Sequence, residues 1–270
     1  MTGIRVSAWL ALAMLVPALT SAQARTQSIA AISWTPERPT EGELFMVRVT
    51  PPAGTRVARI QGEVAGEALH FSPTTSGTYE SLAPVPVDTR ESIAVSVTVA
   101  YADGGPDALI ATVPVASAEY RHEQLTVAPQ FGTQPDSAGQ ARLARDRARA
   151  REVSRQAHSA PRLWTDAIVI PRDDRVTSGF GDGREFNGQI SSRHMGLDLD
   201  GEPGDTVLAV TRGVVALVDD FLLAGSIVYL NHGGGLLSGY FHLSEQLVAQ
   251  GDTVEAGTPI GRVGATGRVT

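Results

Sequence analysis

The sequence predicts a mostly β protein in which an N-terminal β-sandwich, a connecting helix and a second β domain follow one another. Short apolar segments between residues 28 and 128 alternate with turn-forming residues. A helical composition appears only over residues 136–157. Glycine is concentrated in the last third of the chain, where further short apolar segments lie between glycine-rich turns. Such a succession of short strands and turns is typical of sandwiches and barrels.

The composition excludes several classes of function. The chain has 270 residues and a formal net charge of −7, so it has no basic excess that would neutralise nucleic-acid phosphates. It contains no cysteine, which excludes disulfides, thiol catalysis, cysteine-bound zinc and a lipidated cysteine. We therefore expect a globular protein of one or two domains that has no nucleic-acid partner.

Residues 1–24 have the features of an export signal. Arg5 precedes an apolar segment over residues 6–16, and Ala22-Gln23-Ala24 has the small-x-small form of a cleavage site. The apolar segment is short for a bilayer span, so an uncleaved anchor is the weaker alternative. We expect the mature protein to begin near Arg25, to lack a stable membrane span, and to be secreted to the periplasm, the cell envelope or the exterior.

Residues 25–130 are predicted to form an immunoglobulin-like β-sandwich. Residues 93–99 alternate apolar and polar side chains, as a half-buried strand does, and proline- and glycine-rich turns separate the strands. We expect this domain to hold the next domain at a distance, to shield it, or to bind a partner, and these alternatives stay open. Four further side chains are interpreted as core aromatics or as structural or surface histidines: Trp34 and Phe45, and His70 and His122.

Residues 131–162 are predicted to be a linker that contains an arginine-rich helix. Asp136-Ser137 can cap a helix that runs to about Ala157. Because its apolar content is low, we expect a solvated connecting helix with no broad core face. The alternative is that its arginines contact anionic envelope polymers or lipids.

Residues 163–270 are predicted to form the second β domain. Its apolar segments are short, and glycine-containing turns such as Arg212-Gly213 separate them. The segments expected to be strands are 207–210, 214–218, 227–232 and 238–243.

Within this domain, residues 192–200 place an imidazole and a carboxylate four positions apart around a glycine. Neutral imidazole and carboxylate are both good ligands for a zinc-like ion. On a straight strand His194 and Asp198 would lie roughly 13 Å apart, at about 3.3 Å per residue, which is too far to share an ion. We therefore predict a bend or bulge near Gly196, where the missing Cβ lowers its cost.

A second pair of polar side chains occurs near the end of the chain. Tyr240 and His242 are two residues apart, so on a regular strand they would share a face. A general base and a hydroxyl group that stabilises an oxyanion would then stand over one substrate.

Taken in order, the motifs of residues 175–270 resemble those of the lysostaphin-type (LytM-like) zinc metalloendopeptidases of bacterial cell walls. Each motif alone is weak, and the resemblance depends on their joint order and spacing. The motifs are His194-x-Gly196-x-Asp198, Gly204-Asp205-Thr206-Val207-x-Ala209, Gly213-x-Val215, His232-Gly233, Tyr240-x-His242-Leu243, Gly251-x-x-Val254-x-x-Gly257-x-x-Ile260-Gly261 and Gly264-Ala265-Thr266-Gly267-Arg268-Val269-Thr270.

The resemblance implies an antiparallel β-structure, the duplicated-hybrid-motif fold, with a groove along one sheet. It also implies a Zn²⁺-dependent hydrolase that cleaves the peptide cross-links of bacterial peptidoglycan. By position, His194 and Asp198 correspond to two zinc ligands, His242 to a catalytic histidine and Tyr240 to its assistant. Three further residues are expected to be structural or to border the groove: His232 in a turn, and Arg184 and Asn187 at the groove.

The sequence departs from the family pattern in one respect. The family places a His-x-His pair, which holds the third zinc ligand, just after the stretch that corresponds to residues 267–270. A catalytic zinc site needs three protein ligands and an open position for water. We expect the sequence to be a fragment of a complete enzyme; the alternative is an inactive protein that ends at Thr270.

Three other classes of function are compatible with parts of the sequence. The strongest is a non-catalytic relative that binds peptidoglycan or activates a separate cell-wall amidase. A biotinyl- or lipoyl-carrier module would need a modifiable lysine, and the chain contains no lysine. A serine hydrolase is disfavoured because no Gly-x-Ser-x-Gly motif is present.

Overall fold

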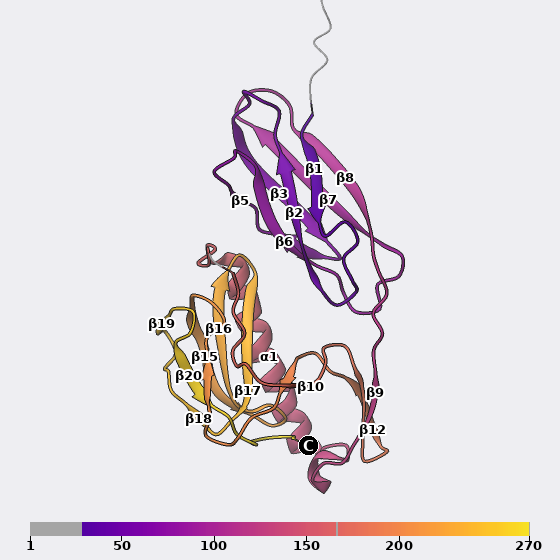
Figure 1. The fold of residues 1–270 in the computed structure, drawn as a ribbon, viewed down its shortest axis with the longest axis vertical. Coiled ribbons are helices and arrows are strands. Elements are labelled where there is room, and N and C mark those ends of the chain that lie inside the picture. Colours follow the sequence, from indigo (N-terminus) through magenta and orange to yellow (C-terminus); the bar gives the residue numbers. More distant parts are fainter. Residues whose placement is uncertain (1–28, 166, 270) are drawn as a thin grey trace, which may run out of the picture.

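A computed structural model describes residues 29–165 and 167–269 of the chain (Figure 1). The predicted export signal over residues 1–24 lies outside the described residues. The described part contains twenty strands, one α-helix and one short 3₁₀ helix. The prediction of a mostly β protein is therefore confirmed.

Two four-stranded antiparallel sheets occupy the N-terminal part of the protein, drawn in indigo to magenta in Figure 1. The first has the order β1-β2-β6-β5 and the second the order β4-β3-β7-β8. The strands of the first sheet are β1 (Ala31–Thr35), β2 (Leu44–Thr50), β6 (Tyr79–Pro84) and β5 (Ser72–Pro73). Those of the second are β4 (Glu67–Leu69), β3 (Val57–Val64), β7 (Ser92–Tyr101) and β8 (Asp107–Pro114).

The two sheets share one hydrophobic core. Every second residue of β7 from Ile93 to Val99 is buried, as the predicted alternation requires. Phe45, Val47 and Val49 of β2 belong to the same buried cluster, and Trp34 packs against it. The prediction that Phe45 and Trp34 belong to the core is thus confirmed, whereas the immunoglobulin-like topology stays a prediction.

The helix α1 (Ser137–Ser159) follows the short 3₁₀ helix η1 (Pro129–Phe131). The carboxylate of Asp136 caps it by accepting a hydrogen bond of 2.8 Å from the backbone N–H of Gly139, as predicted. Most of the helix is solvated and it has no broad core face, as expected, but it is not a free connector, because Val153 and Ala157 are buried and Val153 packs against C-terminal strands. Small side chains let the helix approach the sheet closely, so a narrow apolar stripe is sufficient for docking.

The C-terminal part contains a four-stranded antiparallel sheet, drawn in orange in Figure 1, and a three-stranded antiparallel sheet. The larger has the order β17-β16-β15-β19 and the smaller the order β14-β20-β18. The larger sheet consists of β17 (Leu236–Leu243), β16 (Gly225–Gly233), β15 (Gly213–Phe221) and β19 (Thr253–Val254). The smaller consists of β14 (Thr206–Leu208), β20 (Pro259–Arg262) and β18 (Glu245–Gln246). A core that includes Val215, Leu230 and Ile260 joins the two sheets.

Two small sheets lie beside this part. β10 (Val176–Ser178) pairs with β13 (Asp198–Leu199), and the second sheet has the order β12-β11-β9. β11 (Gly183–Phe186) and β12 (Ile190–Arg193) form an antiparallel hairpin. β9 (His122–Leu125) leaves the N-terminal sheets and pairs with β11 in parallel (Figure 1). A segment from before α1 thus completes a sheet of the C-terminal part.

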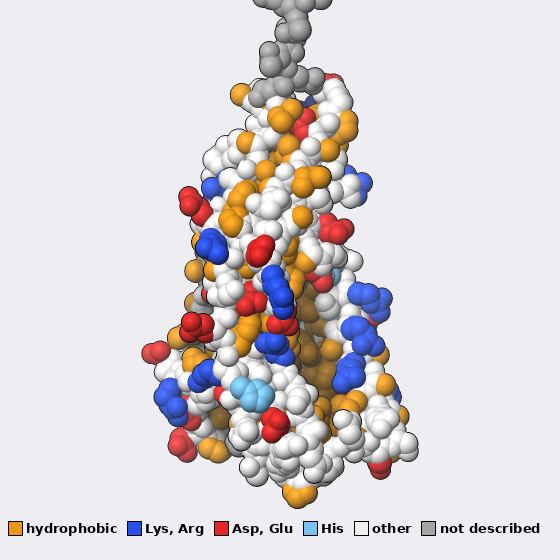
Figure 2. All heavy atoms as spheres, turned by 90° about the vertical axis from the view of Figure 1, so that its right-hand side faces the viewer, with side chains coloured by type: hydrophobic (Ala, Val, Ile, Leu, Met, Phe, Trp, Pro, Cys, Tyr) orange, Lys and Arg blue, Asp and Glu red, His pale blue; other side chains and the backbone are white. Residues whose placement is uncertain are grey.

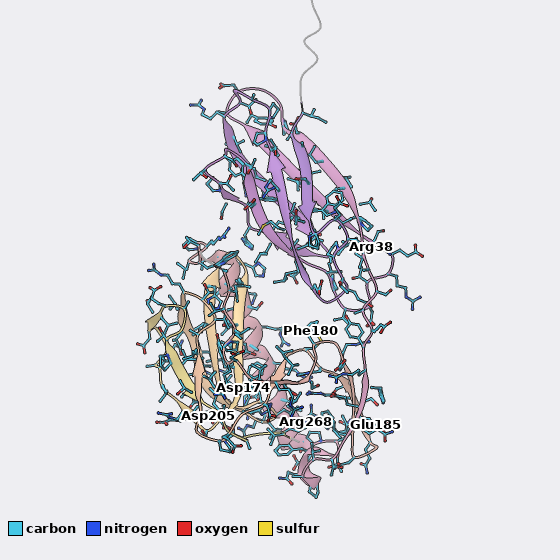
Figure 3. The ribbon with its side chains drawn as sticks, viewed as in Figure 1. Arg38, Asp174, Phe180, Glu185, Asp205 and Arg268 are labelled. Carbon is cyan, nitrogen blue, oxygen red and sulfur yellow. The ribbon has the colours of Figure 1, made fainter. Side chains whose placement is uncertain are left out.

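The N-terminal sheets touch this hairpin region directly. Arg193 forms an ion pair of 2.8 Å with Asp88, and its guanidinium lies 5.1 Å from the centre of the Tyr120 ring. Phe180 lies between the two parts (Figure 3). Figure 2 shows a hollow on one face of the molecule, with hydrophobic side chains in its depth and basic side chains along one rim.

A second contact between the two parts is made by histidines. The Nε2 atom of His70 lies 2.9 Å from the Nδ1 atom of His158, at the end of α1. His70 is therefore structural, as predicted, and His122 is exposed on β9. Among the described residues, no helix combines the length and apolar character that a bilayer span requires.

Candidate metal and active site

His194 and Asp198 are brought together by a bend in the segment between β12 and β13. The chain bends at Gly196, and the Nε2 atom of His194 lies 3.1 Å from Oδ1 of Asp198. On a straight strand these groups would be several times farther apart. The predicted bend near Gly196 is confirmed, and it brings two strand-end side chains into direct contact.

A hydrogen bond to the second ring nitrogen of His194, Nδ1, fixes the orientation of the ring. Nδ1 lies 2.8 Å from the backbone oxygen of Gly179 and 3.3 Å from Oγ of Ser178. A carbonyl oxygen can only accept, so Nδ1 carries the proton and donates to Gly179. In the neutral ring the lone pair of Nε2 then points at the Asp198 carboxylate. Two acceptors at this distance require a cation between them, either a proton on Nε2 or a metal ion.

Asp198 is held as a carboxylate. Burial alone would raise its pKa, but its contacts with His194 and Arg184 outweigh burial and bring the pKa to about 2. Arg184 contacts the second oxygen, Oδ2, so Oδ1 is the atom that remains for a cation. A metal-binding imidazole whose other N–H bonds a carbonyl is the usual arrangement at zinc sites. The pair therefore fits a zinc-like ion.

His242 lies at a bulge in β17. Ser226 pairs with Leu243 and Val228 pairs with Tyr240, so two residues of β17 oppose one residue of β16. His242 has φ near +60°, and its backbone N–H donates to the oxygen of Ala224 at 2.8 Å. Such a φ is uncommon for a residue other than glycine, and it redirects the side chain.

The imidazole of His242 is held at one of its two nitrogens. Its Nδ1 lies 2.7 Å from the backbone oxygen of Thr266, which leaves Nε2 as the acceptor. Burial lowers the pKa of His242, while the hydrogen bond to Thr266 and the nearby charge of Asp198 act in the opposite direction. The charge of Asp198 acts on His242, which brings the two side chains within electrostatic reach of each other. That His242 serves the same site as His194 and Asp198 stays a prediction.

Tyr240 does not join them. The expectation that it shares a face with His242 is wrong, because the bulge interrupts the alternation between the two residues. Tyr240 is 7% exposed and belongs to the core between the sheets. Its hydroxyl accepts hydrogen bonds from the backbone N–H of Val210 at 2.9 Å and from Oγ of Ser238 at 3.0 Å. Its hydroxyl is engaged in holding core strands together.

The structural role expected for His232 is confirmed. Its ring is fully buried, with Nδ1 at 2.8 Å from the backbone oxygen of Arg212 and Nε2 at 2.8 Å from Oγ of Ser238. Asn187 was expected to border a groove, but its side-chain amide instead makes two hydrogen bonds, of 3.0 and 3.1 Å, to the backbone of Val127. It ties the end of β11 to the segment that follows β9.

Arg184 lies inside the site rather than at its border. Its guanidinium contacts Asp198, donates to Oγ of Ser178 at 2.7 Å, and lies 3.2 Å from Oε2 of Glu123. Ser178 and Glu123 are site residues that were not predicted. Ser178 precedes the glycine-rich loop and could have been suspected, whereas nothing in the sequence connects Glu123 with a residue 61 positions away.

Arg268 is a further site residue that was not predicted. Its guanidinium lies 3.9 Å from the centre of the Phe186 ring, and its backbone N–H donates to Leu223 at 2.8 Å. It thus lies between the larger C-terminal sheet and the β9–β11–β12 sheet (Figure 3). Burial and the neighbouring charge of Arg184 lower the pKa of Arg268. Two arginines therefore line the region that holds His242.

Residues 192–270 match the profile of peptidase family M23. These residues include the His194–Asp198 pair, the His242 bulge and Arg268. Residues 192–270 form an M23 peptidase domain. The resemblance to the lysostaphin-type endopeptidases is thus confirmed. Within the described residues of this M23 domain and its neighbours, no three histidine, aspartate or glutamate side chains form a group that could hold a metal ion.

Characterised relatives of the M23 domain include enzymes and an activator. The peptidoglycan DD-endopeptidase ShyC of Vibrio cholerae is 37% identical over 98 residues, which are 36% of this chain and 22% of ShyC. The murein hydrolase activator EnvC of Escherichia coli is 34% identical over 85 residues, which are 32% of this chain and 20% of EnvC. The chain spans less than a third of the length of the curated relatives it matches.

One solved structure shares most of the fold. A candidate peptidase M23 from Pseudomonas aeruginosa matches with a TM-score of 0.63 and 22% identity, covering 86% of each chain. This likeness extends well beyond the M23 domain. The overall arrangement of the described residues therefore also occurs in a second protein.

Proposed function

We propose that the protein is a zinc-dependent endopeptidase that cleaves peptide cross-links of bacterial peptidoglycan. The observation that carries this proposal is the meeting of His194 Nε2 and Asp198 Oδ1 at 3.1 Å within an M23 domain. Each side chain is held at the atom that does not face the other: Nδ1 of His194 by the backbone oxygen of Gly179, and Oδ2 of Asp198 by Arg184. Such anchoring aims the two remaining donor atoms at one point, as a metal site requires.

His194 and Asp198 would supply two of the protein ligands of a catalytic zinc site, which ordinarily has three. Bound zinc polarises a carbonyl group and lowers the pKa of a coordinated water towards neutrality. The remaining steps fall to the side chains of this chain. The carboxylate of Asp198 is ionised over the whole neutral range because its pKa is about 2, so the charge needed for a divalent cation is present.

His242 would act as the general base. Thr266 holds the proton on Nδ1, so Nε2 is free to accept a proton from an attacking water. Burial lowers the pKa of His242 and keeps the ring neutral near pH 7, which a base requires. Arg268 lies close enough for its charge to act on His242 and would stabilise negative charge that develops on the carbonyl oxygen.

The surface beside the site suits an extended peptide. Met195 and Leu197 are large apolar side chains that are 65% and 55% exposed. Met195 and Leu197 flank the bend that carries the ligand pair, so the main chain of a bound peptide would run along apolar contacts. The peptidoglycan substrate follows from the DD-endopeptidase and murein-hydrolase names of the relatives. We also propose export to the cell envelope, in agreement with the signal features of residues 1–24.

A second candidate is a non-catalytic activator of a cell-wall hydrolase. The similarity to EnvC favours it. Retention of His194, Asp198 and His242 favours the enzyme, because an activator has no need for this chemistry.

The decisive experiment is a muropeptide digest, analysed by mass spectrometry, with and without a zinc chelator. An endopeptidase gives products that are split at peptide bonds, and the chelator abolishes them. Cleavage that persists in the chelator contradicts the zinc mechanism, and release of free sugars indicates a glycosidase. No cleavage by the protein alone, together with stimulation of an added amidase, supports the activator.

A further inference from the structure

The strand β9 brings a carboxylate into the site from outside the M23 domain. Its parallel register with β11 places Glu123 opposite Arg184. Glu123 lies in the segment that leaves the N-terminal sheets, and the family match begins only at residue 192. The site therefore has a component that precedes the M23 domain by about seventy residues and precedes α1 as well.

Glu123 is half-buried among the partners of His194 and Asp198. Its Oε2 accepts a hydrogen bond of 2.8 Å from Oγ of Ser178 and lies 3.2 Å from Nε of Arg184. The side chains of Glu123 and Arg184 are 17% and 16% exposed. A charged pair with so little solvent is strongly oriented, unlike a surface ion pair.

Arg184 transmits this orientation to Asp198. Nε faces Glu123, while a terminal nitrogen contacts both Oγ of Ser178 and Oδ2 of Asp198. Because the guanidinium is planar, fixing Nε also fixes the direction of the terminal nitrogen. Oδ2 is thus occupied from one side, and Oδ1 is turned to His194, where the metal would bind.

The charge balance also depends on Glu123. Arg184 and Arg268 are close enough for each charge to act on the other, and both cations stand beside a site that is to receive a divalent cation. The Glu123 carboxylate offsets the charge of Arg184 through Oε2, while its Oε1 lies 3.8 Å from Arg121. Without it, the full charge of Arg184 would be directed at Asp198 and would compete with the metal for that carboxylate.

We propose that Glu123 is a positioning residue of the metal centre, acting through Arg184 on Asp198. This inference rests on the proposed zinc function and deepens it. One consequence is that a fragment that begins at residue 163 lacks β9, and with it the group that orders the ligand pair.

The test is the zinc affinity of the full chain and its variants, measured by competition with a fluorescent chelator. Glu123→Gln keeps the size of the side chain and removes its charge. We expect about 10- to 100-fold weaker zinc binding, the usual effect of losing a partner that orients a ligand. The matched control is Glu119→Gln on the same segment, since Glu119 is exposed; its affinity should equal that of the wild type.

A double-mutant cycle separates positioning from a general loss of structure. In an Arg184→Gln background, Glu123→Gln should no longer change zinc affinity, because the side chain through which it acts is gone. Urea unfolding of the metal-free variants shows whether they are folded. If Glu123→Gln changes affinity equally in both backgrounds, the relay through Arg184 is refuted.

The outcomes distinguish this inference from the proposed function. If the wild type binds zinc and Glu123→Gln binds it equally well, Glu123 has no positioning role and the zinc function stands. If the wild type itself does not bind zinc, the zinc function fails and this inference fails with it.

Discussion

The two parts of the protein bury different kinds of side chains. The N-terminal sheets enclose a core of aliphatic and aromatic groups, and Ser81 is the one polar residue fully buried there among those described. The described C-terminal part buries four polar residues, namely Ser178, Asp182, Thr211 and His232. Buried polar groups need hydrogen-bond partners, so each one fixes a neighbouring segment in a single arrangement.

The buried polar residues of the C-terminal part lie where the positions of the candidate site residues must be exact. Asp182 accepts hydrogen bonds from the backbone N–H groups of Arg121 and Gly179, and it thereby locks the loop whose carbonyl oxygen orients His194. His232 and Ser238 form a chain of hydrogen bonds with Tyr240 next to the His242 bulge. A core of aliphatic groups stabilises a fold, but directional polar contacts hold catalytic groups at defined distances. The following substitutions examine this contrast.

The largest effect on stability is expected in the N-terminal core. Phe45→Ala leaves a cavity where a side chain is 2% exposed, and it should destabilise the protein by about 3–5 kcal/mol. Urea unfolding measures the loss, with Phe45→Leu as a milder control. Zinc affinity below the unfolding transition should stay unchanged. A parallel fall in affinity would show that the two parts are energetically coupled.

The largest effect on metal binding is expected at the ligand pair. Asp198→Asn removes the charge of a proposed zinc ligand and should weaken zinc binding by more than about 100-fold, beyond the range of an orienting partner. Isothermal titration measures it. The control is Asp200→Asn, whose carboxylate is exposed and pairs with Arg175 on the surface. Equal affinities of the two variants would remove Asp198 from the site.

His232 provides a pH-dependent test of the polar core. Burial lowers its pKa below the ordinary value of 6.5, so protonation favours the unfolded chain. The stability that neutral His232 contributes is complete above pH 6.5 and is lost as the pH falls through the lowered pKa. His232→Gln should cost about 1–3 kcal/mol at pH 7.5, because it leaves buried partners unpaired.

The measurement is urea unfolding of the wild type and His232→Gln at pH 7.5 and at pH 5.5. The difference between the two proteins should narrow at the lower pH. Other histidines with lowered pKa, such as His70, affect both proteins equally and cancel. A difference that stays constant with pH would show that His232 is not titrating in this range.

The smallest effect is expected at the surface of α1. Arg142 forms an ion pair with Asp220 in which both side chains are exposed. Arg142→Ala should cost about 0–1 kcal/mol in urea unfolding, and added salt should reduce the loss further. Arg147→Ala, on another face of the helix, is the control. A loss well above 1 kcal/mol would mean that helix docking depends on charge rather than on Val153 and its apolar neighbours.

Strands, helix starts and bends that depend on neighbouring residues could be predicted from the amino-acid sequence. The alternation in residues 93–99 determined a strand with one buried face, and Asp136 determined the start of α1. The bend at Gly196 followed from a short-range requirement, because His194 and Asp198 can share an ion only if the chain turns between them. The ordered motifs of residues 175–270 were sufficient to indicate the family.

The positions of side chains that depend on partners far away in the sequence became known only from the three-dimensional structure. Tyr240 and His242 are separated by a bulge that involves contacts with Ala224 and Thr266, so strand periodicity alone misplaced Tyr240. Glu123 reaches Arg184 through a parallel strand pairing across 61 positions. Local patterns carry no information on such pairing, since the hydrogen bonds of a sheet join backbone groups that every residue has.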